Sequence, residues 1–268
     1  MSSPTLHEIN GYQYIDDGPH TDLPPIVCLH GMLGEVSNWK DTVPFLARHA
    51  YRVLVPLLPV YGLPMKESNV PGLVAHVRGF LDTMGLERVI LAGNSLGGQL
   101  AMFYTLDHPD RVVALVLSGS SGIYEVETGT ATLRRKDRDF IRERAAITFY
   151  DPVHVTDELV DEAYSIVNDR GVALRLIRLA RSAQAETVTD QLADITVPTL
   201  LVWGRNDRIT PPDVAEAFLE HLPNAELHFI DRCGHAPMME RPAAFNKILL
   251  AFLHQTIGSA VLAPTNST

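Results

Sequence analysis

The sequence predicts an α/β fold built on a mainly parallel, doubly wound sheet, and three observations lead to that prediction. Short apolar runs recur along the chain, helical patterns alternate with them, and 268 residues are enough to bury a large core. The runs are apolar at nearly every position rather than at every second one. Such runs are typical of strands that helices cover on both faces.

The predicted strands share a high content of β-branched and aliphatic residues. They span residues 25–29, 52–55, 88–92, 112–117, 199–203 and 226–230. Helical patterns span residues 37–48, 70–84, 96–107, 211–221 and 239–254. Two further runs, 6–9 and 12–15, are separated by Asn10-Gly11, a dipeptide that favours a tight turn, so we expect an antiparallel hairpin at the sheet edge.

One long interval interrupts this alternation. About eighty residues between Leu117 and Thr199 contain no convincing strand pattern, whereas the stretches 130–139, 156–168 and 172–185 are helix-prone. Because a loop of that length is abnormal in a compact domain, we expect a helical insertion over the end of the sheet. The predicted division is a core of residues 1–121 and 192–257, an insertion of residues 122–191 and a disordered tail of residues 258–268.

Composition excludes several classes of function. The formal net charge of −10 argues against non-specific nucleic-acid binding, which requires a basic surface. Cys28 and Cys233 have no metal-ligand spacing, and we expect no metal and no organic cofactor. Cys28 lies in an apolar run and is expected to be a buried free thiol, Cys233 stands close to the candidate base His235, and whether the two cysteines interact is left open. The chain shows neither a signal-peptide pattern nor an apolar run long enough to span a bilayer, so the expectation is a cytoplasmic protein without a membrane partner.

The segment Gly93-Asn-Ser-Leu-Gly97 stands between a predicted strand and a predicted helix. A chain that turns sharply there places Ser95 in a strained conformation, and Gly93 and Gly97 remove side chains that would collide with nearby backbone. Ser95 then lies at a helix N-terminus, where free N–H groups stabilise developing negative charge. The spacing alone is a weak signal, and its position makes Ser95 the candidate nucleophile.

A nucleophilic serine needs a base, and the base needs an acid that orients it. His235 and Asp207 each follow a predicted strand, and catalytic groups of open parallel sheets gather at those strand ends. His30 is the competing base, although a structural role in its turn fits it better. Asp231 is the competing acid, although it lies only four residues before His235 and is expected to be exposed.

An oxyanion hole requires two backbone N–H groups aimed at one point. The first expected donor is Leu96, which follows the nucleophile directly. The second is Met32, in the loop after the strand 25–29, where Gly31 allows a close approach of the backbone.

Taken together, His30-Gly31, the segment 93–98, the segment 204–207 and Gly234-His235 give the chain a resemblance to the α/β-hydrolase superfamily along nearly its whole length. The resemblance implies a cap after the sixth strand and the order nucleophile, acid, base. The details resemble small bacterial carboxylesterases and meta-cleavage-product hydrolases. Two departures weaken the resemblance to the second group: Ala236 replaces the usual aromatic residue, and the segment 156–163 lacks the usual cap arginine. Its substitute is left open among Arg170, Arg175, Arg178 and Arg181, since nothing in the sequence selects one.

These features predict a serine hydrolase that cleaves small, apolar carboxylic esters through an acyl-enzyme. Two alternatives remain open. One is carbon–carbon bond hydrolysis of the meta-cleavage type by the same residues, and the other is a ligand-binding receptor on a hydrolase scaffold. The sequence leaves the natural substrate and the oligomeric state undetermined.

Overall fold

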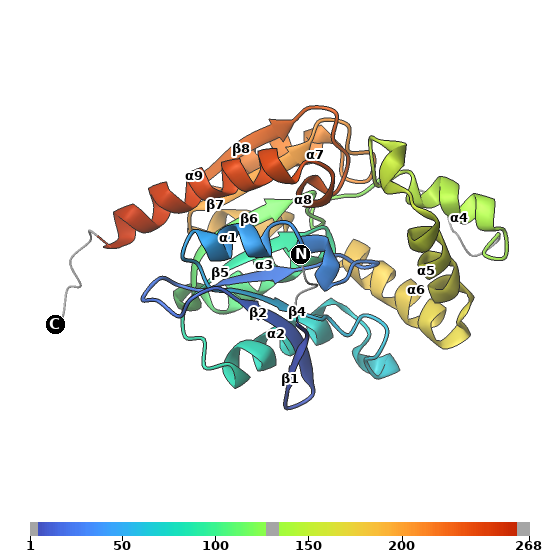
Figure 1. Cartoon of the computed structure of the whole chain (residues 1–268), viewed down its shortest axis with the longest axis horizontal. Helices are drawn as coiled ribbons and strands as arrows, with labels where there is room; N and C mark the ends of the chain where they lie inside the picture. The colour runs from blue at the N-terminus through green and yellow to red at the C-terminus, as the bar shows by residue number, and fades with distance from the viewer. Residues whose placement is uncertain (1–4, 127–133, 262–268) are drawn as a thin grey trace.

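The computed structural model describes residues 5–126 and 134–261, with side chains described as far as Ile257. Its centre is one eight-stranded sheet in the order β1-β2-β4-β3-β5-β6-β7-β8 (Figure 1). The strands are β1 (His7–Ile9), β2 (Tyr12–Asp17), β3 (Ile26–Leu29), β4 (Val53–Pro56), β5 (Val89–Asn94), β6 (Val112–Ser118), β7 (Thr199–Gly204) and β8 (Ala225–Ile230). The pairs from β4 to β8 are parallel, which confirms the predicted fold class.

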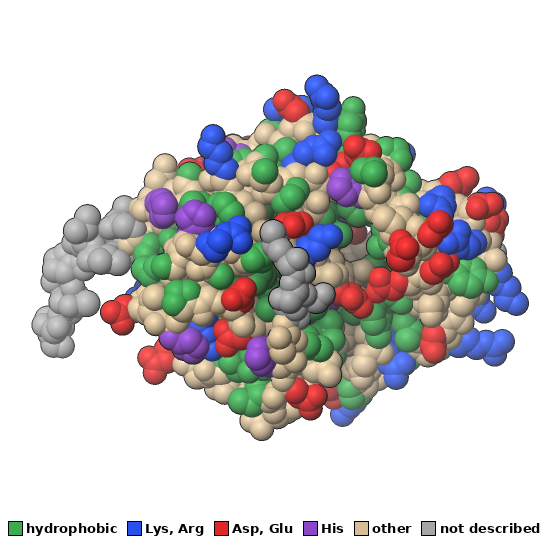
Figure 2. Space-filling view, viewed as in Figure 1, with side chains coloured by type: hydrophobic (Ala, Val, Ile, Leu, Met, Phe, Trp, Pro, Cys, Tyr) green, Lys and Arg blue, Asp and Glu red, His purple; other side chains and the backbone are tan. Residues whose placement is uncertain are grey.

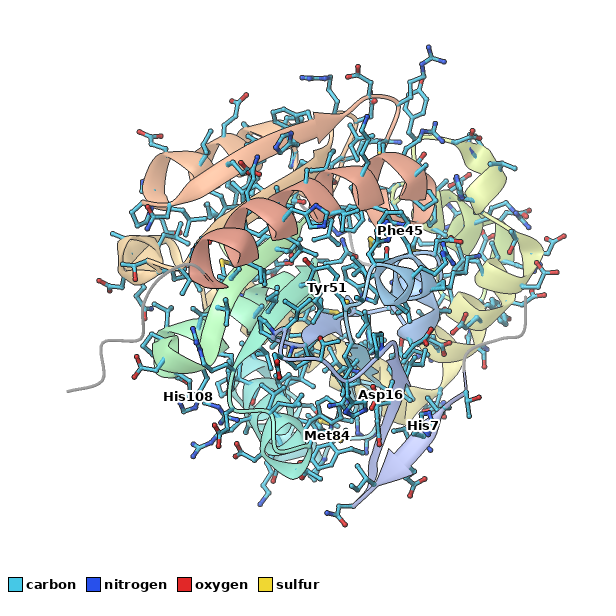
Figure 3. All side chains as sticks on the ribbon, turned by 60° about the vertical axis from the view of Figure 1, so that its left-hand side comes forward. His7, Asp16, Phe45, Tyr51, Met84 and His108 are labelled. Carbon is cyan, nitrogen blue, oxygen red and sulfur yellow. The ribbon has the colours of Figure 1, made fainter. Side chains whose placement is uncertain are left out.

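The first two strands form the expected hairpin. β1 pairs with β2 in antiparallel register, and β2 pairs in antiparallel fashion with β4. Asn10 and Gly11 both have positive φ, at 51° and 83°, as a two-residue hairpin turn requires. Arg52, the residue before β4, forms an ion pair of 2.7 Å with Asp16 on β2. Figure 3 labels Asp16 and Tyr51, the residue before Arg52.

Helices cover both faces of the sheet, and alternate strand residues serve the two faces. In β3, Val27 and Leu29 belong to the core on the side of α2, α3 and α7, whereas Ile26 and Cys28 belong to the core on the side of α1 and α9. All four side chains are fully buried. This burial on both faces explains why the central strands read as continuous apolar runs.

The helices follow the predicted order. Their bounds are η1 (Val36–Trp39), α1 (Val43–Arg48), η2 (Met65–Glu67), α2 (Val70–Thr83), α3 (Leu96–Asp107), η3 (Pro109–Arg111), α4 (Arg138–Ala145), η5 (Pro152–His154), α5 (Asp157–Asn168), α6 (Arg170–Ala185), η6 (Thr189–Asp194), α7 (Pro212–His221), α8 (Pro237–Glu240) and α9 (Pro242–Val261). Met84 and His108 follow the last residues of α2 and α3, and both lie in the lower part of Figure 3.

Several boundaries differ from the prediction. The expected helix 37–48 is divided into η1 and α1, and the expected helix 239–254 is divided into α8 and α9. Pro242 is the first residue of α9 and lacks the N–H that a continuous helix would use. The expected tail at 258–261 is instead the last turn of α9, and residues 262–268 lie outside the described residues. The helix expected from residue 130 begins at Arg138, and residues 130–133 also lie outside the described range.

Helices α4, α5 and α6 project to one side of the sheet, at the right of Figure 1. We call residues 138–185 the α4–α6 segment. It follows β6, the sixth strand, and Gln99 on α3 connects it to the core by donating to the carbonyl oxygens of Ala183 and Glu186 at 2.9 and 2.6 Å. Within the described residues, no helix has the combination of length and apolarity that crossing a bilayer requires.

Candidate active site

Ser95 occupies the turn between β5 and α3. Its backbone has φ 54° and ψ −124°, a region that non-glycine residues adopt only when their surroundings enforce it. Between Val89 and Met102, Ser95 is the one residue that is not buried. The strained turn therefore leaves Ser95 partly exposed between buried neighbours.

Close backbone contacts enforce this turn. A Cβ atom on Gly93 would lie 2.4 Å from the backbone of Gly97, and one on Gly97 would lie 2.3 Å from the carbonyl oxygen of Leu29. Contacts that short do not occur, so both positions require glycine here. The collisions with nearby backbone that the sequence predicts for side chains at positions 93 and 97 therefore occur in this structure.

Asp207 and His235 form a buried pair. The Oδ2 atom of Asp207 lies 2.9 Å from Nδ1 of His235, and the two side chains are 0% and 7% exposed. Asp207 follows β7, and His235 follows β8. The structure therefore brings together two side chains that are 28 residues apart and were selected for their places at strand ends.

The Asp207 carboxylate is held by three further donors. The N–H groups of Ile209 and Thr210 donate to Oδ1 at 2.8 and 3.0 Å, and the Thr210 hydroxyl donates to Oδ2 at 2.9 Å. The same hydroxyl lies 3.3 Å from Nδ1 of His235. Thr210 therefore fixes both members of the pair, a role that the sequence analysis did not identify.

Charge around His235 favours its protonated form. Burial disfavours that form, but the charge and hydrogen bond of Asp207, together with the charge of Glu125, outweigh burial and raise the pKa of His235. A base with a raised pKa accepts a proton more readily from a hydroxyl.

Asn94 and Gly119 place His235 beside the nucleophile turn. The Asn94 amide donates to the carbonyl oxygens of Ser118 and His235, at 2.8 and 3.0 Å. Gly119 has φ 51°, and a Cβ atom there would lie 2.6 Å from the carbonyl oxygen and 3.0 Å from Nδ1 of His235. Any side chain at position 119 would displace His235, so the observed place of the imidazole requires glycine there. Neither residue was identified from the sequence, although a glycine directly after a buried parallel strand is a signal that could have been used.

The expected oxyanion loop lies against the nucleophile. A Cβ atom on Gly31 would be 3.3 Å from Cβ of Ser95, so Met32 follows a residue in contact with the nucleophile turn. Leu96 is the first residue of α3, and its N–H has no acceptor within that helix. Within the described residues, the N–H of Met32 donates no hydrogen bond. Among the described residues, the N–H groups of Leu96 and Met32 therefore have no hydrogen-bond acceptor.

The two competing residues have other partners. His30 is fully buried; its Nδ1 lies 2.8 Å from the carbonyl oxygen of Gly31, and its Nε2 accepts from the N–H of Leu58 at 2.9 Å. Burial lowers the pKa of His30 to about 4, against a smaller effect of the Gly31 hydrogen bond. Asp231 pairs with Arg205 at the surface. His30 is therefore structural, as expected, and Asp231 is exposed, as expected.

A buried carboxylate connects the histidine loop to the α4–α6 segment. Glu240, 3% exposed, accepts from the N–H groups of Gly234 and Asp151 at 2.6 and 2.7 Å. The N–H of His235 donates to the carbonyl oxygen of Thr148 at 2.7 Å. The chain just after α4 is therefore bonded directly to the loop that carries the candidate base.

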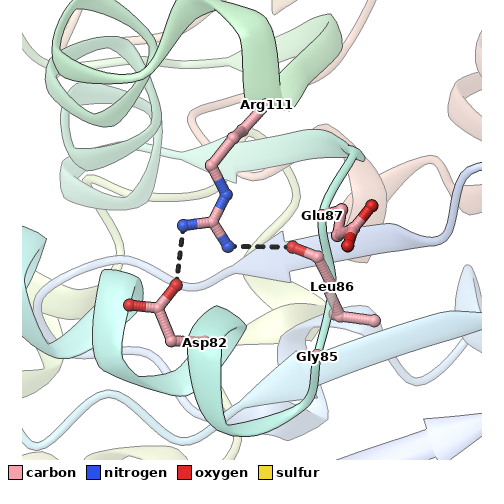
Figure 4. Close-up of a pocket in the computed structure, with 5 residues that line it drawn as sticks. All are labelled: Asp82, Gly85, Leu86, Glu87 and Arg111. Atoms are coloured by element: carbon pink, nitrogen blue, oxygen red, sulfur yellow. Dashed lines mark hydrogen bonds and ion pairs between the residues drawn. The ribbon is translucent and has the colours of Figure 1, made fainter.

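A cavity lies away from Ser95. Asp82, Gly85, Leu86, Glu87 and Arg111 line a space of about 390 Å³ (Figure 4). These residues precede β5 and β6, so the cavity is at the amino ends of the strands, opposite Ser95. Arg111 donates to Asp82 and to the carbonyl oxygen of Leu86, which occupies its guanidinium in structural contacts. In the residues that the structure describes, no three His, Cys, Asp or Glu side chains form a metal site, and both cysteines are buried free thiols.

Comparison with known proteins gives a consistent family. Residues 26–248 match the model of the alpha/beta hydrolase family. A 2-hydroxy-6-oxononadienedioate/2-hydroxy-6-oxononatrienedioate hydrolase from Paraburkholderia phymatum is 33% identical over 253 residues, which are 86% of this chain and 87% of that protein.

Solved structures of hydrolases have a similar fold. MGS-MChE2, an alpha/beta hydrolase enzyme from the metagenome of lagoon sediments at Mar Chica, is 34% identical, with a TM-score of 0.77 over 94% of this chain and 98% of that one. The 2-hydroxy-6-oxo-6-phenylhexa-2,4-dienoate hydrolase of Rhodococcus sp. strain RHA1 is 26% identical, with a TM-score of 0.78 over 94% and 97%. The family match covers most of the chain, and the fold agrees with it, so this protein belongs to the α/β-hydrolase family.

Proposed function

We propose that this protein is a serine hydrolase in which Ser95 is the nucleophile, His235 the general base and Asp207 the acid that orients it. The observation that carries the proposal is the buried contact of 2.9 Å between Asp207 and His235, next to the strained turn of Ser95. The α4–α6 segment would be the cap over this site.

The proposed reaction has two steps. Ser95 attacks a carbonyl carbon while its proton passes to Nε2 of His235, and the negative oxygen rests on the N–H groups of Leu96 and Met32. His235 gives the proton to the leaving group. Water then attacks the acyl-enzyme by the same route and releases the acid. Asp207 stays ionised throughout.

For the bond that is cleaved, we place carbon–carbon bond hydrolysis first. Three relatives that are 30–33% identical over 85–93% of this chain are named 2-hydroxy-6-oxononadienedioate/2-hydroxy-6-oxononatrienedioate hydrolase. A solved structure that is 25% identical, with a TM-score of 0.79, is named as a meta-cleavage product hydrolase. These similarities favour the alternative over the ester reaction that we expected first. The substrate would be a vinylogous diketone, cleaved beside its ketone.

Ester hydrolysis is the second candidate, and the charges near the site favour it. A substrate with an acidic end would need a cationic partner. Of the four arginines on α6, Arg175 and Arg178 donate to the backbone carbonyl oxygens of Leu63 and Lys66, which engages part of each guanidinium. The histidine is followed by Ala236, and Glu125 adds negative charge beside His235. A neutral ester meets no electrostatic penalty in these surroundings.

The test compares wild type with Ser95→Ala on two substrate sets. One set is p-nitrophenyl esters from acetate to decanoate, and the other is a 2-hydroxy-6-oxo-dienoate followed by its loss of absorbance. We expect sustained turnover of one set by wild type and a loss of several orders of magnitude in the variant. The set that turns over identifies the bond. Turnover that survives Ser95→Ala would contradict the proposal, and single-turnover labelling without sustained hydrolysis would support the receptor alternative.

A further inference from the structure

The chain has two tryptophans, Trp39 on η1 and Trp203 on β7, and both are fully buried. The ring of Trp39 packs against Phe245, with ring centroids 6.0 Å apart. The ring of Trp203 packs against Phe218 in the same way, at 5.9 Å. The indole N–H groups differ, because Nε1 of Trp203 donates to the carbonyl oxygen of Thr210 at 2.8 Å. Within the described residues, Nε1 of Trp39 has no hydrogen-bond partner. The Trp203 N–H therefore makes a specific contact that burial of an indole ring does not by itself require.

Thr210 ends the turn that carries Asp207, residues 204–210, which we call the acid turn. The N–H and the hydroxyl of Thr210 donate to the two oxygens of the Asp207 carboxylate, at 3.0 and 2.9 Å. The hydroxyl oxygen also lies 3.3 Å from Nδ1 of His235. Thr210 is fully buried, and Trp203 supplies the donor for its carbonyl oxygen, so each polar group of this residue has a partner. The direction of the hydroxyl is thereby tied to a backbone that the indole holds.

The two ends of the acid turn are held differently. At its start, the N–H groups of Arg205 and Asn206 donate to carbonyl oxygens of β8 and of the loop after β8, at 2.9 Å each. At its end, the N–H of Val126 donates to the carbonyl oxygen of Ile209 at 2.9 Å, and the Trp203 indole donates to the next carbonyl oxygen. Trp203 therefore connects the end of the acid turn to β7, the strand from which the turn starts.

We propose that Trp203 is a positioning residue for the base: its indole N–H holds the backbone of Thr210, whose hydroxyl keeps the buried acid–base pair in line. The catalytic meaning of this inference rests on the proposed function. The hydroxyl proton goes to the Asp207 carboxylate, so a lone pair of the same oxygen faces Nδ1 of His235. This arrangement favours the tautomer with the proton on Nδ1 and leaves Nε2 to accept the proton of the nucleophile.

The two tryptophans allow hydrogen bonding to be separated from packing. Trp203→Phe keeps an aromatic ring but removes the N–H, so the buried carbonyl oxygen of Thr210 loses its donor. Trp39→Phe is the matched control: the change of volume and the burial are the same, but the N–H that is lost has no partner within the described residues. An effect confined to Trp203→Phe reports on the hydrogen bond rather than on lost ring packing.

The first measurement does not depend on catalysis. NMR of the full-length protein gives the rate at which the Nδ1 proton of His235 exchanges with water, with the signal identified by its absence in His235→Gln. We expect exchange to be roughly tenfold faster in Trp203→Phe and in Thr210→Val, and close to wild type in Trp39→Phe and Thr210→Ser. Equal acceleration in both tryptophan variants would overturn the inference, and so would wild-type exchange in Thr210→Val, which changes no ring.

The second measurement is the rate at which phenylmethylsulfonyl fluoride inactivates each variant. We expect a decrease of roughly tenfold in Trp203→Phe and in Thr210→Val, restored in Thr210→Ser and absent in Trp39→Phe. In the double variant the two decreases should not multiply, because the indole acts through Thr210. Decreases that multiply would contradict that order of action. If wild type is not labelled at Ser95, the proposed function fails, whereas the exchange rates still decide whether Trp203 positions His235.

Discussion

The carboxyl ends of the parallel strands and the α4–α6 segment hold their charged groups in opposite ways. Asp207 after β7 and Glu240 in α8 after β8 are both buried, and backbone N–H groups donate two hydrogen bonds to each carboxylate. In the α4–α6 segment, Asp157 pairs with Arg138 and Arg142 at the surface, with side-chain exposures of 71%, 41% and 35%. Acidic and basic side chains gather over this segment at the right of Figure 2.

The core behind Ser95 also buries more apolar side chains than α4 and α5 do. Most of α3, directly behind the nucleophile, is buried, whereas Ile141 and Val160 are the buried residues of α4 and α5. A buried polar group loses its full solvation if a partner is removed, but an exposed ion pair exchanges its partner for water. Substitutions of similar chemistry should therefore have large effects at the strand ends and small effects in the segment.

The largest effect on activity in this comparison is expected for Gly119→Ala. The new Cβ atom would collide with the backbone oxygen of His235, 2.6 Å away, and would displace the imidazole from its place beside the nucleophile. We expect kcat/KM to fall by about 10²-fold, because small misplacements of catalytic groups have effects of that size. Steady-state kinetics on the substrate set identified for wild type gives the measurement.

The control for that variant is Gly85→Ala. Gly85 also has positive φ, 64°, but nothing lies within 4 Å of an added Cβ atom. Both variants should lose about 1–2 kcal/mol of unfolding free energy from the left-handed backbone, measured by urea denaturation. Only Gly119→Ala should lose activity, and an equal loss in Gly85→Ala would mean that backbone strain, not contact with His235, is responsible.

The sequence predicted Ser95, Asp207 and His235 as site residues but not Gly119. Ser95, Asp207 and His235 were found because each stands directly after a strand, and the parallel sheet brings those ends to one edge. The strands themselves were recognisable because burial on both faces leaves a continuous apolar run.

Asn94 and Gly119 contact His235, which is far from both of them in the sequence. Glu240 lies in a predicted helix, and nothing in that helical pattern points to its donors, the N–H groups of Gly234 and Asp151. The chain after β6 is held by the hydrogen bonds that Ser121 and Val126 donate to the carbonyl oxygens of Ser95 and Ile209. No local pattern encodes such contacts. The break before α9 was readable in principle, since Pro242 stands inside the expected helix.

An intermediate effect is expected for Glu240→Gln, at the junction of the two regions. One amide oxygen cannot serve both N–H donors at their present positions, and the amide NH₂ would face an N–H group. We expect a loss of about 1–3 kcal/mol in unfolding free energy and a decrease of kcat/KM of about tenfold. Glu220→Gln, which removes one charge from an exposed position on α7, is the control, with neither change. A stability loss without any change in kcat/KM would show that the junction does not position His235.

The smallest effect is expected for Asp157→Asn, in the outer part of the α4–α6 segment. Its carboxylate contacts Arg138 and Arg142, and these hydrogen bonds and charges lower the pKa of Asp157. A lowered pKa contributes stability that is present above the unfolded pKa of about 3.9 and is lost as the pH falls through the folded value. The difference in Tm between variant and wild type should therefore be small at pH 7, smaller in high salt and absent in acid.

Because the site is bonded to residues 148–151 and not to this ion pair, kcat/KM should stay within about twofold of wild type. A tenfold loss of kcat/KM would mean that the outer helices transmit their packing to His235, and the contrast between the two regions would then fail.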